Sequence, residues 1–171
     1  MEDTTPPADR LNVLLADRDE TLATAESLTG GLVGSRVTDV AGASAYFDRG
    51  FVTYTYDAKR ELLGVSRESL DAHGAVSEPV VREMAAGARD RPDADWALAP
   101  TGIAGPSGGT AETPVGRVYL GAAHAPPSGT GESFVRAARL VLDGDRDAVT
   151  RGADDRALGP PVDARDDADA C

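Results

Sequence analysis

Hydrophobic and polar positions along this chain follow two periods, one of two residues and one near 3.6, in alternating segments. Leucines and a valine in residues 11–15 predict a short amphipathic helix that ends near Arg18. Residues 21–26 are short and β-compatible, and apolar residues in 32–40 recur at helical spacing. Residues 27–31 are therefore predicted to form a strand-to-helix turn, where side chains are presented.

The middle of the chain contains the clearest strand pattern. Residues 46–56 are rich in aromatic and β-branched side chains, as strands are. Asp57 is predicted to cap a helix over 58–63. Two further helices are expected over 66–72 and 77–88, the second with an apolar face and a proline near its start.

The second half of the chain returns to strands. Residues 95–101 are predicted to be a buried strand that ends at Pro100, because proline cannot donate to a sheet ladder. A glycine-rich loop follows over 102–109. Two more strands and a last helix are expected over 115–125, over 132–142 and from 145. This alternation, without repeats or internal linkers, predicts an α/β protein with a single three-layer α/β/α sandwich.

The two ends of the chain differ from its middle. Residues 1–8 are polar and contain prolines, and we predict that they are disordered. The domain is expected over 9–158. Residues 159–171 consist mostly of Asp, Ala, Gly and Pro, which predicts an acidic disordered tail.

The charge balance excludes some partners. The chain of 171 residues has 29 acidic and 17 basic residues, for a net charge of −12, so a nucleic-acid-binding surface is disfavoured. It contains neither an apolar run of the roughly 20 residues that span a bilayer nor a signal-peptide pattern, which predicts a cytoplasmic protein with no membrane contact. With one cysteine and two histidines, no disulfide scaffold or cysteine-based zinc site is expected.

The basic residues have an unusual distribution. Sixteen of the 17 are arginine, and Lys59 is the one lysine, while 20 of the 29 acids are aspartate. An Asp-rich, Lys-poor surface is typical of a halophile-type cytoplasm, and a GC-rich genome gives a similar bias. A lysine retained in such a chain raises the question of a chemical role.

The common nucleotide-binding and hydrolase motifs fit poorly. Neither glycine-rich stretch matches the phosphate-binding loop of NTPases or the dinucleotide fingerprint. A Ser-His-Asp triad would need His73 or His124 as its base, and the sequence leaves both open, although a structural role is more common for each. We expect no cofactor and no metal ion.

A serine–lysine pair is the other route to a nucleophile. Ser27 lies at the predicted turn, where the backbone N–H groups that follow it are suited to an oxyanion, although an ordinary N-cap serine has the same position. Lys59 needs a pKa lowered by desolvation to act as a base, and the alternative is a solvated charge on a helix face. Tyr54 either points its hydroxyl into the same site or fills the core.

Five ordered motifs between residues 19 and 151 resemble the CinA C-terminal domain family. They are Ala25-Glu26-Ser27-Leu28-Thr29-Gly30-Gly31, Arg49-Gly50-Phe51-Val52-Thr53-Tyr54, His73-Gly74-Ala75-Val76-Ser77-Glu78-Pro79, Thr101-Gly102-Ile103-Ala104-Gly105-Pro106 and Pro114-Val115-Gly116. The family includes amidases that hydrolyse nicotinamide mononucleotide to nicotinate mononucleotide and ammonia. The resemblance implies a three-layer sandwich, a metal-free serine–lysine mechanism and a homo-oligomer.

The resemblance also implies roles for individual residues. Ser27 matches the nucleophile, Lys59 the base and Tyr54 an assisting hydroxyl. Arg146 is the candidate for the substrate phosphate, with a plain surface arginine as the alternative. The residues implied to surround the nicotinamide and ribose are Thr29, Gly30 and Gly31 in the turn and Thr101, Gly102 and Gly105 in the later loop.

This chain departs from the family pattern in three places. Relatives often have cysteine at position 28, where this chain has leucine, and serine at position 101, where it has threonine. The acidic residues 154–156 and the prolines that follow are expected to shorten the last helix. The alternative to an amidase is a non-catalytic nucleotide-binding or interaction domain of the same family, for which loss of the serine or the lysine would have been a sign.

Overall fold

The computed structural model describes residues 4–127 and 130–159. Within these residues the chain forms five strands, which are β1 (Leu22–Glu26), β2 (Phe47–Val52), β3 (Trp96–Gly102), β4 (Arg117–His124) and β5 (Phe134–Val141). It also forms six α-helices, which are α1 (Pro7–Arg18), α2 (Leu32–Thr38), α3 (Tyr56–Leu63), α4 (Arg67–His73), α5 (Glu78–Asp90) and α6 (Arg146–Ala157). A short 3₁₀ helix, Ala43–Ala45, precedes β2.

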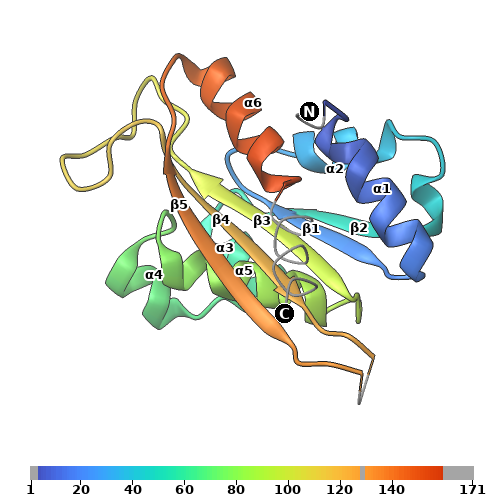
Figure 1. Ribbon diagram of the computed structural model, residues 1–171. Coiled ribbons are helices and arrows are strands. Elements are labelled where there is room, and N and C mark those ends of the chain that lie inside the picture. Colours follow the sequence, from blue (N-terminus) through green and yellow to red (C-terminus); the bar gives the residue numbers. More distant parts are fainter. Residues whose placement is uncertain (1–3, 128–129, 160–171) are drawn as a thin grey trace.

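The strands form one mixed sheet in the order β2-β1-β3-β4-β5 (Figure 1). β1 is parallel to β2 and to β3, and β4 and β5 are antiparallel to their neighbours. The carboxyl ends of β2, β1 and β3 therefore lie at the same edge of the sheet.

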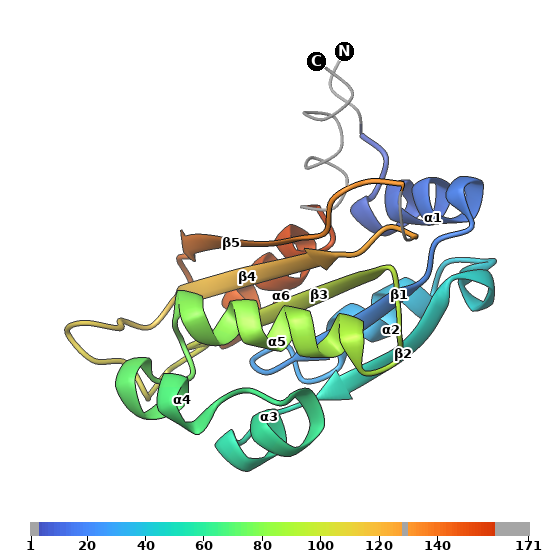
Figure 2. The same ribbon diagram turned by 90° about the horizontal axis from the view of Figure 1, so that it is seen from below.

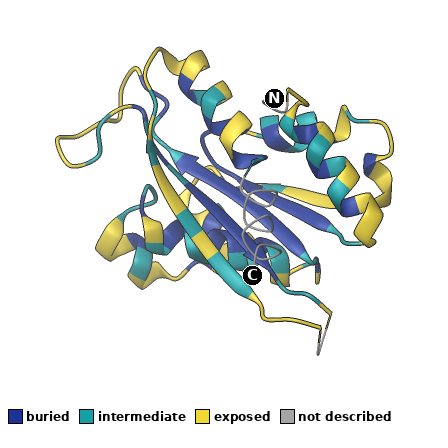
Figure 3. Ribbon diagram, viewed as in Figure 1, coloured by how far each residue is buried: buried dark blue, intermediate teal, exposed yellow. Residues whose placement is uncertain are grey.

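Helices cover both faces of this sheet, which confirms the predicted three-layer sandwich. In Figure 2, α1, α2 and α6 lie on one side of the strands and α3, α4 and α5 on the other. Each side has its own apolar core: Leu15, Val37 and Val149 are buried in one, and Leu63 and Met84 in the other. The central strands are buried and the edge strand β5 is more exposed (Figure 3).

The strand predicted over 46–56 is too long. β2 ends at Val52, and Tyr56 is already the first residue of α3. The predicted cap is also wrong, because Thr55, and not Asp57, is the N-cap, with its hydroxyl accepting a hydrogen bond from the Ala58 N–H at 3.1 Å. A helix that starts at Tyr56 places Lys59 and Leu63 on one face, and both are buried.

The expectation that β3 ends at Pro100 is also wrong. Pro100 pairs with Leu120 of β4, and the strand continues to Gly102. The Pro100 carbonyl accepts a hydrogen bond from the Ser27 N–H at 3.3 Å, so the nitrogen of Pro100 also faces β1 and not β4. The paired residues of β1 and β3 end at Thr24 and Leu98, while the pairing of β3 with β4 continues through Pro100, which is why the strand tolerates the proline.

The ends of the domain differ from their predictions. Helix α1 begins at Pro7, so Pro7 and Ala8 belong to a helix and not to a disordered segment over 1–8. Residues 154–156 do not end helix α6, although the helix does end before Gly159. It runs to Ala157, because the buried Asp154 pairs with Arg36 of α2. Of the tail predicted over 159–171, residues 160–171 lie outside the described part of the chain.

Gly87 is predicted to be essential for the packing of α5 against α3. A Cβ atom at this position would lie 2.0 Å from the Leu63 carbonyl oxygen, which is backbone and cannot rotate away. We expect Gly87→Ala to lower the free energy of unfolding by about 2 kcal/mol, measured by urea denaturation. Gly152→Ala is the matched control in α6, where the new methyl would meet the flexible end of Leu142. Equal midpoints for the two variants would contradict the prediction.

Among the residues that the structure describes, no helix is both long enough and apolar enough to cross a membrane.

Candidate active site

The candidate site lies at the carboxyl ends of the parallel strands. The chain leaves β1 toward α2 on one face of the sheet, and leaves β2 toward α3 on the other. The strand order reverses at β1, and crevices at such switch points are where open α/β sheets bind ligands. Ser27 directly follows β1. Lys59 lies in the first turn of α3, which a short loop connects to the end of β2.

Ser27 and Lys59 are in contact. Lys59 Nζ lies 3.1 Å from Ser27 Oγ, although the two residues are 32 positions apart in the sequence. The same nitrogen also donates to the Thr53 carbonyl oxygen at 2.6 Å and to the Tyr54 carbonyl oxygen at 3.3 Å. The three N–H groups of a lysine ammonium thus have three acceptors.

Lys59 is fully buried, and no carboxylate contributes to the shift of its pKa. Desolvation disfavours its charged form and lowers its pKa from 10.5 to about 8. At pH 7 about a tenth of a group with this pKa is neutral, against well under a thousandth for an ordinary lysine. The environment of Lys59 is therefore that of a usable base, and the alternative of a solvated surface charge is wrong.

Of the two arrangements predicted for Tyr54, the core position is wrong. Its side chain is 67% exposed, and its hydroxyl has no hydrogen bond to Ser27 or Lys59 among the described contacts. The contact that Tyr54 makes with Lys59 is through its backbone carbonyl. The exposure excludes a core position, and because the side chain lines the cavity in front of Ser27, the assisting hydroxyl stays a prediction.

The backbone N–H groups at the start of α2 are used by a carboxylate of the protein itself. The Glu26 side chain accepts hydrogen bonds from the N–H groups of Gly31, Val33 and Gly34 and from the Thr29 hydroxyl. The Gly30 N–H is also used, because it donates to the Ser27 carbonyl. Of the N–H groups expected to bind an oxyanion in the 27–31 turn, only those of Leu28 and Thr29 have no partner among the described contacts.

The three residues of this turn that were predicted to bind substrate have structural contacts in it. The Thr29 hydroxyl donates to Glu26 Oε1 at 2.7 Å and is buried. Gly30 and Gly31 both have positive φ, +58° and +105°, which a side chain would disfavour. These residues shape the turn that presents Ser27, and none of the three lines the cavity.

A cavity of about 290 Å³ lies in front of Ser27. The later loop forms much of its wall, including Thr101, Gly102 and Gly105. The Thr101 hydroxyl donates to the Ala75 carbonyl oxygen at 3.0 Å, which ties β3 to the segment before α5. The loop thus lies at the predicted place, but the Thr101 hydroxyl already has a protein partner.

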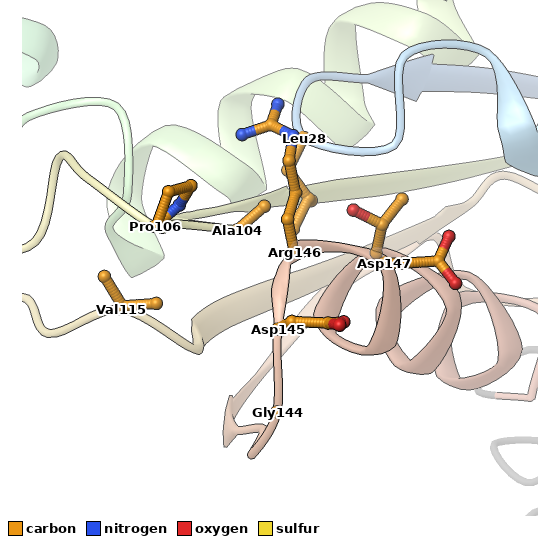
Figure 4. A pocket seen from close by; sticks show the side chains of 9 residues that line it. Leu28, Ala104, Pro106, Val115, Gly144, Asp145, Arg146 and Asp147 are labelled. Carbon is orange, nitrogen blue, oxygen red and sulfur yellow. The ribbon is translucent and has the colours of Figure 1, made fainter.

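Arg146 lies between this cavity and a larger neighbouring one. It lines both, and its Nη1 donates to the Gly105 carbonyl oxygen at 2.7 Å. Figure 4 shows the neighbouring cavity, where the Arg146 side chain reaches toward Leu28 while Asp145 and Asp147 point to the other side. The contact with Gly105 fixes the guanidinium at the mouth of the site and leaves other N–H groups for a ligand.

Neither histidine is placed to serve as the base. His124 is buried at the opposite end of the sheet, opposite Trp96 at the start of β3. Its ring stacks on Trp96, and its Nε2 lies 3.5 Å from Glu20 Oε1. His73 is exposed at the end of α4, and the described side-chain partner of Ser27 Oγ is Lys59. Over residues 4–127 and 130–159, no three His, Cys, Asp or Glu side chains gather as a metal site would require.

Sequence reasoning missed two groups of this site. One is the Glu26 carboxylate, which is 1% exposed, and the other is the Thr53 carbonyl that binds Lys59. A carboxylate between a buried strand and a turn is the signal that points to the first. A backbone carbonyl carries no sequence signal.

The fold and the site define a class of protein: a three-layer α/β/α domain with a serine and a buried lysine in contact at the ends of its parallel strands. The chain belongs to the family described as the CinA C-terminal domain, whose model matches residues 4–160.

Individual relatives agree with this membership. The nicotinamide-nucleotide amidohydrolase PncC of Escherichia coli strain K12 is 50% identical over 151 residues, which cover 88% of each chain. A putative competence-damage inducible protein of Symbiobacterium thermophilum is 54% identical over 92% of this chain, which spans only 37% of that relative's length. The crystal structure of the competence/damage inducible protein CihA from Agrobacterium tumefaciens superposes with a TM-score of 0.81 at 42% identity, covering 89% of each chain.

Proposed function

We propose that this protein is an amidohydrolase that converts nicotinamide mononucleotide to nicotinate mononucleotide and ammonia. The observation that carries the proposal is the 3.1 Å contact between Lys59 Nζ and Ser27 Oγ beside a cavity. The 50% identity to PncC over most of both chains supplies the substrate. The non-catalytic alternative has no comparable support, because a buried lysine of lowered pKa next to a serine is costly to keep without chemistry.

Lys59 acts as the general base in this proposal. A neutral amine has two N–H groups and one lone pair, and the Thr53 and Tyr54 carbonyls each accept one N–H. The lone pair then faces Ser27 Oγ and accepts its proton as the oxygen attacks the carboxamide carbon. The resulting ammonium has a third N–H, for which Ser27 Oγ is the third partner. The same three contacts therefore serve both protonation states.

The remaining steps use the same groups. The Leu28 amide, next to the nucleophile and without a described partner, is the donor for the oxyanion. The tetrahedral intermediate collapses when the Lys59 ammonium returns its proton to the leaving nitrogen, which departs as ammonia. Lys59, neutral again, then deprotonates a water molecule that attacks the acyl carbon. The nicotinate product leaves as its acid and loses that proton to solvent, while the Lys59 ammonium returns its own proton to Ser27 Oγ.

The direct test is turnover of the proposed substrate. Purified protein is incubated at high salt with nicotinamide mononucleotide, and ammonia and nicotinate mononucleotide are measured together. Equal release of both products is expected from the wild type, and none above background from Ser27→Ala. If wild type and Ser27→Ala bind the nucleotide equally and neither releases ammonia, the non-catalytic alternative replaces this proposal.

Arg146 is proposed to bind the substrate phosphate, and its replacement should affect binding more than chemistry. We expect Arg146→Ala to raise KM for nicotinamide mononucleotide about tenfold with kcat nearly unchanged, because one charge-assisted hydrogen bond to the phosphate is lost. Nicotinamide riboside, which lacks the phosphate, should show no difference between the variant and the wild type. Arg139→Ala, on the exposed face of β5, is the matched control. Equal losses on both substrates would refute a phosphate contact.

A further inference from the structure

Glu26 is a buried carboxylate without a role in the mechanism above. We propose that Glu26 is a positioning residue: its side chain fixes the turn that presents Ser27, and its backbone carbonyl fixes the segment that binds Lys59. The activity tests of this inference depend on the proposed function, but its spectroscopic test does not.

The side chain of Glu26 organises the turn. Its Oε1 accepts from the Thr29 hydroxyl at 2.7 Å, from the Val33 N–H at 2.9 Å and from the Gly31 N–H at 3.1 Å. Its Oε2 accepts from the Gly34 N–H at 2.9 Å. A carboxylate that is 1% exposed is costly to bury unless it is hydrogen-bonded in this way. Four hydrogen bonds from residues 29–34 therefore bind the start of α2 to the residue next to Ser27.

Helix α2 lies directly against this carboxylate. A Cβ atom on Gly34 would lie 3.4 Å from Glu26 Oε2 and 3.6 Å from Thr24 Oγ1, which is ordinary van der Waals contact. The start of α2 is thus close enough to β1 for its N–H groups to reach Glu26. The carboxylate lies between strand and helix and does not line the cavity in front of Ser27.

The backbone of Glu26 connects to the other half of the pair. Its carbonyl oxygen accepts from the Thr53 N–H at 2.8 Å, and the Thr53 carbonyl accepts from Lys59 Nζ at 2.6 Å. Lys59 Nζ in turn lies 3.1 Å from Ser27 Oγ, and Ser27 is bonded covalently to Glu26. The contacts close a ring through Glu26, Thr53, Lys59 and Ser27. Glu26 therefore acts on both reacting groups without touching the substrate.

The activity test separates positioning from binding. We expect Glu26→Ala to lower kcat about 30-fold with KM unchanged, within the roughly hundredfold that a misplacement of 1 Å can cost. Glu26→Gln should lose only severalfold, because its amide oxygen can keep the three contacts of Oε1. Glu83→Ala is the matched control: Glu83 also accepts a backbone N–H, that of Ser66 at 2.6 Å at the start of α4, and should leave kcat unchanged.

The spectroscopic test uses the single lysine of the chain. Protein grown with lysine carrying ¹³C at Cε gives one side-chain signal, and its titration reports the pKa of Lys59. In Glu26→Ala we expect a loosened turn to admit water, so that this pKa rises from about 8 toward 10.5. Glu83→Ala should titrate as the wild type does.

The outcomes decide between this inference and the proposed function. A folded Glu26→Ala with wild-type kcat and an unshifted Lys59 titration would overturn the positioning role. If Glu26→Ala does not fold, Glu26→Gln and Thr29→Val, which removes one hydroxyl donor to Oε1, take its place, and wild-type behaviour of both would have the same meaning. If the wild type does not hydrolyse nicotinamide mononucleotide, the proposed function fails, and the Lys59 titration still tests Glu26.

Discussion

Replacing Lys59 by methionine is expected to lower kcat for nicotinamide mononucleotide by about a thousandfold, because it removes the group that accepts the Ser27 proton. Methionine is similar in length and apolar, so it fits a fully buried position that already penalises charge. Lys59→Arg should be equally inactive although it keeps the charge, since a guanidinium stays protonated and cannot act as a base. The measurement is steady-state ammonia release at saturating substrate.

The loss in these variants must be separated from unfolding. Lys59→Met leaves the Thr53 and Tyr54 carbonyls without their amine donor but also removes a desolvated cation, so urea denaturation midpoints should remain close to the wild type. Lys59→Ala opens a space that a small primary amine can enter, and added methylamine should restore part of the activity. A folded Lys59→Met that keeps more than a tenth of wild-type kcat would exclude Lys59 as the base.

The pairing of Ser27 with Lys59 was predicted through the resemblance to the family, because position alone left an N-cap serine and a solvated lysine open; the structure shows that each follows a strand of the parallel part of the sheet. The carboxyl ends of such strands meet at one edge, so a serine after one strand and a lysine one helical turn after the next are brought together. The single lysine of an arginine-rich chain added a compositional signal. The contact is a long-range consequence of strand order and direction, which the alternation of elements alone does not fix.

The exposure of the Tyr54 side chain could not be predicted from the sequence. Its position depends on where β2 ends, and the β-rich composition of residues 46–56 does not mark that end at Val52. The Thr55 cap, not the strand propensity, decides where α3 begins. Tyr54 therefore lies in the loop between β2 and α3 and not in a strand, which agrees with its 67% exposure.

The use of the α2 N–H groups was not predictable from spacing either. A turn followed by a helix is the usual pattern of an anion site, and it predicts free donors for the substrate. In this chain the anion is Glu26, one residue before the nucleophile. Whether a helix start binds a substrate or an internal carboxylate depends on the direction of one side chain at the end of a buried strand. An alternation of polar and apolar residues shows which way a strand side chain points only when one face of the sheet is exposed to solvent. Every residue of β1 is buried, so the direction of the Glu26 side chain could not be predicted in this way.

The lowered pKa of Lys59 predicts how activity depends on pH. If the neutral amine is the reactive form, kcat/KM should follow its fraction, rising about tenfold per pH unit below 8 and levelling above it. Between pH 6 and pH 9 the neutral fraction of a group with a pKa of about 8 increases roughly 90-fold. An ordinary lysine would instead give a rise that continues past pH 10. The measurement is the initial rate at low substrate over this range in buffers of constant ionic strength.

Stability should show the same pKa by an independent route. Lys59 has a lower pKa in the folded state, about 8, than the 10.5 of the unfolded chain, so between these two values the unfolded state binds more protons. The free energy of unfolding of the wild type, relative to Lys59→Met, should therefore increase as pH rises from 8 to 10.5 and be constant below 8. The ¹³C titration of the single lysine must give the same midpoint as the rates. A flat rate profile from pH 6 to 9, or a lysine signal that titrates near 10.5, would show that Lys59 is an ordinary cation and would remove the base from the mechanism.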